Sequence, residues 1–257
     1  MLLCVVVGLI LLVVGASTLT RPAALVAAQV RPDAPTTSAP APAPQGAAPS
    51  AATSPSTAAA DPSPEVVEGR LDDVFVADRG PGSYAAAHVS APTTADAGRL
   101  YRVDVRVEDG LGLDPDDVAR AIGRTLDDPR SWRSTGRARF SVVPMGQRAD
   151  LHAYVVTPGT TDRLCAPLLT RGEVSCRAGD KVVLNAKRWV LGAEAYGSTP
   201  DAVAGYREYL VNHEFGHALG RSHVGCPARG RPAPVMLQQT KGLQGCTANP
   251  WPSVTKG

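Results

Sequence analysis

Three histidines, a glutamate and a glycine stand at spacings suited to binding and using a metal ion. The run from His213 to His223 reads H-E-x-x-H-x-x-G-x-x-H. Positions four apart lie on one face of a helix, so His213 and His217 can present two nitrogens to one ion. Glu214 points about a quarter turn away, where it is placed to take a proton from water and not to bind the metal.

The third histidine reaches the same ion only if the chain turns back after the helix. Gly220 can adopt positive φ, which ends a helix and reverses the chain, so His223 can supply a third nitrogen. Three protein ligands leave one position open, which is typical of catalytic zinc. The alternative is that these are ordinary core or surface histidines. It requires three of the five histidines in the chain to reach ligand spacing by accident.

The same eleven residues resemble the extended zinc motif of the metzincin metallopeptidases. The resemblance implies a zincin fold, a Zn²⁺ cofactor and a methionine in a tight turn beneath the metal. Met236, in the run Pro-Val-Met-Leu, fits that methionine. Several metzincin groups carry a tyrosine just after it that stabilises the reaction intermediate. Leu237 and Gln238 stand there instead, so the residue that takes this role is left open.

Residues 101–251 are also similar to an uncharacterised exported family of high-GC Gram-positive bacteria. Two short runs carry this second resemblance: TDRLCAP at residues 161–167 and LQGC at residues 243–246. The resemblance covers most of the globular part of the chain and implies no known substrate.

The amino terminus predicts export. Residues 1–20 are almost wholly apolar and long enough to cross a bilayer as a helix, which favours an uncleaved signal anchor. The small residues at 15–17 also suit a signal peptidase, so a cleaved signal peptide stays open. In either case the rest of the chain lies on the extracellular side, anchored to the cell membrane or secreted.

The next segment predicts a spacer, and the remainder a single domain. Residues 21–64 are rich in Pro, Ala, Ser and Thr, and bury too little apolar surface to offset ordering. Residues 65–257 suffice for one domain with a core. Within them, residues 65–90 precede the first expected strand and are a candidate pro-segment.

Four cysteines in this domain suit disulfides in an exported protein. They permit three pairings. We expect Cys165–Cys176 and Cys226–Cys246, because each pair closes a short local loop, and the second would enclose Met236. Zinc binding by these thiols is the rival interpretation, and the lack of a C-x-x-C pair argues against it.

The apolar patterns predict an α+β fold with a mixed, twisted sheet and two main helices, the second bearing the ligands. A small irregular C-terminal subdomain should follow Gly220. Proline at the first helical position marks both helix starts. The expected helices are residues 115–128 and 200–217, and the expected strands are residues 100–107, 139–143, 151–156 and 181–185.

The remaining histidines and the tryptophans are assigned no chemistry. His88 and His152 lie outside the motif, and His152 falls inside an expected strand. Trp132, Trp189 and Trp251 are interpreted as core or cleft-wall aromatics.

Together these features predict an extracellular zinc metalloendopeptidase that cleaves a peptide or protein substrate. A net charge of +2 without a basic stripe argues against nucleic acid, and only the N-terminal segment should meet a membrane. We expect a monomer whose substrate adds to an exposed edge strand, with residues 151–156 and 173–176 as candidates. The alternatives are a zinc-binding envelope module without turnover and an amide hydrolase acting on cell-wall peptides.

Overall fold

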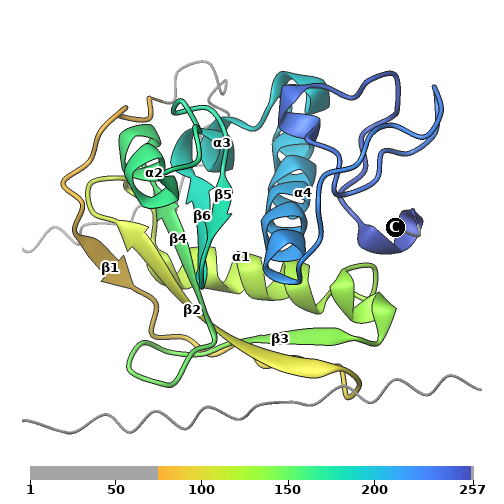
Figure 1. Cartoon of the computed structure of the whole chain (residues 1–257). Coiled ribbons are helices and arrows are strands. Elements are labelled where there is room, and N and C mark those ends of the chain that lie inside the picture. Colours follow the sequence, from red (N-terminus) through yellow and green to blue (C-terminus); the bar gives the residue numbers. More distant parts are fainter. Residues whose placement is uncertain (1–74, 256–257) are drawn as a thin grey trace, which may run out of the picture. The chain divides into compact units, whose positions relative to one another are not determined.

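The computed structural model describes residues 75–255, and the expected signal segment and spacer lie outside this range. Within it, no helix combines the length and the apolar character needed to cross a membrane. Figure 1 shows the arrangement of the described elements.

A mixed six-stranded sheet forms the centre of the fold. The strand order is β1-β2-β4-β6-β5, with β3 paired to β2 beside β1. The pairs β2–β3, β2–β4 and β4–β6 are parallel, whereas β1 and β5 run antiparallel to their neighbours. The strands are β1 Tyr84–Ala86, β2 Arg99–Glu108, β3 Ala138–Val142, β4 Leu151–Val156, β5 Cys176–Ala178 and β6 Lys181–Asn185.

Four α-helices cover the two faces of this sheet. Alternate residues of β2, such as Val103 and Val105, share the main core with α1 and α4. The opposite face packs a smaller core in which Cys165 of α2 meets Val156 of β4. The helices are α1 Pro115–Asp127, α2 Pro158–Cys165, α3 Ala186–Leu191 and α4 Pro200–Ala218.

The α+β prediction is confirmed at the level of fold class, with corrections. Strands β4 and β6 have the expected bounds, and β2, β3, α1 and α4 agree within one residue at each end. Helices α1 and α4 are the two main helices that were expected, and two short helices that the patterns did not predict, α2 and α3, are also present. With 8 and 6 residues they are too short to show helical periodicity in the sequence.

The candidate pro-segment, residues 65–90, includes a strand of the sheet that the sequence did not predict. Its residues 84–86 form β1, which pairs with β2 from Tyr84 opposite Glu108 to Ala86 opposite Arg106. This part of the segment therefore belongs to the sheet, and removing it would strip an edge strand. Residues 65–74 lie outside the described range.

Neither of the two candidate edge strands for substrate binding is an edge strand with the expected bounds. Residues 151–156 form β4, which lies between β2 and β6, so that candidate is wrong. Strand β5 lies at the end of the sheet opposite β1, and it pairs with β6 alone among the described strands. Only Cys176 of the second candidate, residues 173–176, belongs to it.

The disulfides are the two expected pairs. Cys165 at the end of α2 bonds to Cys176 at the start of β5, and Cys226 bonds to Cys246. The second bridge spans the loop that contains Met236. Beyond Gly220 the described chain has only two short 3-10 helices, η4 Gln239–Lys241 and η5 Pro252–Val254, so the expected irregular C-terminal region is present.

Replacing Cys226 and Cys246 together with serine should lower the free energy of unfolding by about 3 kcal/mol, because the open loop gains entropy in the unfolded chain. Urea denaturation under oxidising conditions measures this loss. The matched variant at Cys165 and Cys176 opens a shorter loop, so its loss should be slightly smaller. An unchanged midpoint in both variants would contradict a stabilising role.

Candidate metal centre

Helix α4 carries the first two histidines of the cluster. Thr199 caps its start by accepting a main-chain hydrogen bond, and Pro200 occupies the first turn. His213 and His217 lie one turn apart near the other end, which falls at Ala218. Both imidazoles therefore project from one face.

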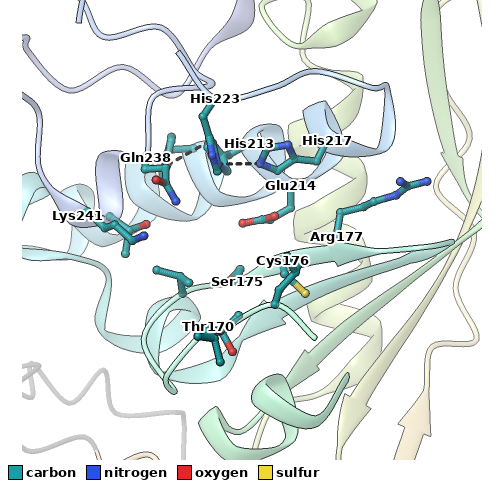
Figure 2. A pocket seen from close by; sticks show the side chains of 15 residues that line it. Thr170, Ser175, Cys176, Arg177, His213, Glu214, His217, His223, Gln238 and Lys241 are labelled. Atoms are coloured by element: carbon teal, nitrogen blue, oxygen red, sulfur yellow. Dashed lines mark hydrogen bonds between the residues drawn. The ribbon is translucent and has the colours of Figure 1, made fainter. Parts of the chain in front are cut away.

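The turn after α4 brings the third histidine back. Gly220 has a φ of +79°, in the left-handed region that favours glycine. The Arg221 N–H donates to the Gly216 carbonyl at 2.9 Å and closes the helix end. The chain reverses there, and His223 lies against the two helical imidazoles (Figure 2).

The three imidazoles meet through their Nε2 atoms. His223 Nε2 lies 3.3 Å from that of His213 and 3.0 Å from that of His217. Nitrogen ligands of a tetrahedral ion with bonds of about 2.0 Å stand roughly 3.3 Å apart. Among residues 75–255 this is the one group of three such side chains close enough to share an ion.

Main-chain carbonyls set the tautomer of the two helical imidazoles. His213 Nδ1 lies 2.8 Å from the Val235 carbonyl, and His217 Nδ1 lies 2.8 Å from the Arg221 carbonyl. A carbonyl oxygen only accepts, so each Nδ1 carries the proton and donates it. Each Nε2 then keeps a free lone pair, which is the arrangement that metal-binding histidines adopt.

Burial keeps these imidazoles neutral. It lowers the pKa of His213 to about 3, against the opposing effect of the bond to Val235. Burial also lowers the pKa of His217 and His223, and the charges of Arg177 and Lys241 lower these two further. Neutral lone pairs held this close repel one another unless a cation lies between them, so the cluster is suited to a metal ion.

Glu214 brings a carboxylate to the same place. The residue is 4% exposed, and its Oε2 has no hydrogen-bond partner among the described residues. Burial raises the pKa of this carboxyl to about 8. Its side chain points into the cavity below the imidazoles (Figure 2), where it can exchange a proton with a bound molecule.

Met236 packs against α4 at Gly216. The turn from Pro234 closes with a hydrogen bond from the Leu237 N–H to the Pro234 carbonyl at 2.9 Å. A Cβ added at Gly216 would stand 2.4 Å from Met236 Sδ and 2.6 Å from Trp132 Cζ2. Only glycine at 216 allows this contact between α4 and the methionine.

The two positions after Met236 differ in where they lie. Leu237 is 1% exposed and packs in a small core with Ala233 and Cys246. Gln238 is half-buried and borders the cavity. Of the two, only Gln238 is placed to reach a bound molecule.

A cavity of about 410 Å³ opens in front of the imidazoles. One wall comes from the loop after α2 and from β5, and the other from η4 and the residues before it. Leu169, 83% exposed, stands on the first wall. The other lining residues are Leu168, Thr170, Val174, Ser175, Cys176, Arg177, Tyr209, His213, Glu214, His217, His223, Gln238, Thr240 and Lys241.

The remaining histidines lie elsewhere. His88 is exposed before α1, and His152 lies on β4, where its Nδ1 is 2.9 Å from Asp104 Oδ2. Trp132, Trp189 and Trp251 are all buried, in line with the expectation of core or cleft-wall aromatics, and the first two belong to the main core.

Sequence reasoning missed several residues around the centre. Tyr209 lies one turn before His213, and its hydroxyl donates to the Leu237 carbonyl at 3.0 Å, which ties α4 to the turn after Met236. Its spacing of four from His213 was the available signal. Arg177 and Lys241 carried no signal, because each is an isolated cation far from the motif.

Comparison with known proteins gives a family and no activity. Residues 72–252 match the model of a family described as a protein of unknown function (DUF3152). No curated protein and no solved structure matches the chain. Because the family match spans well over half of its length, the chain belongs to the DUF3152 family.

Proposed function

We propose that this protein is a zinc-dependent metallopeptidase that acts outside the cytoplasm. The observation that carries the proposal is the convergence of three Nε2 lone pairs beside an unpartnered carboxylate in one cavity. His213, His217 and His223 would hold the ion. Their nitrogen donors and tetrahedral spacing fit zinc, and a structural site would leave no use for Glu214.

Zinc, when bound, supplies the Lewis acidity that makes water a nucleophile at neutral pH and polarises a carbonyl. The protein does the proton transfer. Glu214 accepts the proton of the attacking water at a carboxylate oxygen and delivers it to the leaving amine. Gln238, at the rim of the cavity, is placed to donate its amide N–H to the developing oxyanion in place of the absent tyrosine.

The edge strand β5 supports a peptide as the substrate. It borders the cavity through Cys176 and Arg177, and its outer edge has no strand partner among the described residues. An extended peptide that pairs with this edge would lie along the cavity that the imidazoles border. A mixed sheet with an antiparallel edge strand next to the ligand helix also agrees with the zincin-like fold that the motif implies.

Two features support action outside the cytoplasm. Both disulfides need an oxidising compartment to persist. The apolar residues 1–20 suit an export signal or anchor, although they lie outside the described residues.

Removing the metal should abolish peptide hydrolysis, and adding zinc back should restore it. The test is metal analysis of the purified protein, followed by cleavage of an unfolded protein and of a peptide library, with and without a chelator. A zinc-loaded protein that cleaves neither would instead support a binding module without turnover. New free amines released only from isolated cell wall would support the amide hydrolase.

A further inference from the structure

Two cations stand on opposite walls of the cavity. Arg177 lies on β5, and Lys241 ends η4 after the Met236 turn. In Figure 2, Arg177 lies on the His217 side of the imidazoles and Lys241 lies on the other side. Both are exposed and both border the cavity.

Neither cation is neutralised by the described part of the protein. The nearby cations Lys187 and Arg188 both pair with Glu173. Arg177 and Lys241 take part in no ion pair within residues 75–255. Two positive charges are therefore left for a ligand.

The lining offers almost no negative charge to offset them. Among the described residues, Glu214 is the one acidic side chain that borders the cavity, and it is buried below the imidazoles. A metal ion in the centre would add further positive charge. An entering molecule thus meets a cleft with mainly positive charge. This charge favours the binding of anionic ligands and increases their association rate.

The direction of the edge strand shows which groups of a peptide meet the cations. A peptide paired with β5 runs along the line from Arg177 past the imidazoles towards Lys241. Peptide residues on either side of the imidazoles would then each approach one of the two cations. We propose that the site selects acidic peptides, with Asp or Glu side chains flanking the bond to be cleaved. This inference rests on the proposed function, and Arg177 and Lys241 are the specificity-determining residues.

The test is a binding measurement that needs no turnover. Two fluorescent peptides share one sequence except that two Glu residues flanking the central bond are Gln in the second. Anisotropy measures their affinity for full-length protein carrying Glu214→Gln. At low ionic strength the Glu peptide should bind roughly 5-fold more tightly, and high salt should remove most of the preference.

Charge-reversal variants test whether Arg177 and Lys241 cause the preference for the Glu peptide. Lys241→Glu and Arg177→Glu should each weaken it, and the double variant should reverse it in favour of the Gln peptide. Arg148→Glu is the matched control. Its exposed cation lies between β3 and β4, away from the cavity, and the same change of charge there should leave the preference intact.

Equal affinities at low ionic strength, or a preference that survives in the double variant, would overturn the inference. Because binding is read without hydrolysis, either result would leave the proposed peptidase activity standing. Conversely, a chain that never cleaves a peptide but prefers the Glu peptide refutes the activity and keeps the anionic selectivity.

Discussion

The Glu214→Ala protein should bind zinc as well as the unchanged chain does and hydrolyse peptides at least about 100-fold more slowly. The carboxylate lies next to His213 in the chain but does not join the three Nε2 atoms, so its loss removes no metal ligand. It has no hydrogen-bond partner at Oε2, so truncation leaves no buried group unpaired. The measurement is kcat on a cleaved library peptide, together with metal content.

Two controls separate the chemical role of Glu214 from a structural one. Glu214→Gln keeps the shape of the side chain and should lose the same activity, because an amide cannot accept the proton. The melting temperature of Glu214→Gln should not fall, since it keeps the packing of the side chain and Oε2 has no hydrogen-bond partner to lose. Retained hydrolysis in Glu214→Ala would remove this residue from the mechanism and leave the metal centre untouched.

The Glu108→Ala protein should lose at least about 3 kcal/mol of free energy of unfolding. Glu108 is 1% exposed, and its carboxylate accepts three hydrogen bonds: from Gly82 N at 2.9 Å, Thr157 N at 2.7 Å and Thr160 Oγ1 at 2.6 Å. Truncation leaves two buried donors and one half-buried donor without a partner, each costing about 1 kcal/mol or more. Urea denaturation measures the loss.

The conservative substitution Glu108→Gln at the same position is the control. It keeps one accepting oxygen, so it should lose clearly less stability than the alanine variant. Because Thr157 and Thr160 begin α2, which carries Cys165 and the loop on one wall of the cavity, the alanine variant should also be cut by proteases within residues 166–175 first. A loss below about 1 kcal/mol would show that water satisfies these donors.

The elements that could be predicted are those whose burial leaves a regular pattern. Residues 182–184 are apolar and follow a turn at residues 179–180, and Pro200 follows a capping Thr199, so β6 and the start of α4 could be predicted from the sequence. By contrast, β5 has three residues and owes its strand conformation to pairing with β6. Short elements of this kind are formed by tertiary contacts, which local patterns do not encode.

For the candidate metal centre, the sequence predicts the three histidines but not the groups that surround them. Fixed spacing on a helix brings His213 and His217 together whatever surrounds them. The acceptors for their Nδ1 atoms are backbone carbonyls, which every residue possesses and which have no signature in the sequence. The approach of Arg177 and Lys241 depends on the sheet and on the chain path after Met236, so it could be seen only in the folded structure.

The use of carbonyls to orient the imidazoles bears on how related sequences can diverge. Substitution at Val235 or Arg221 changes a side chain and keeps the oxygen that holds the adjacent histidine. Relatives can thus vary at these two positions without losing the centre, and no partner carboxylate should co-vary with the histidines. Insertions or deletions between Gly220 and Met236 are a different matter, because they move the carbonyls themselves. Constant spacing in this interval, more than constant residue identity, is the mark by which a working centre should be recognised among homologues.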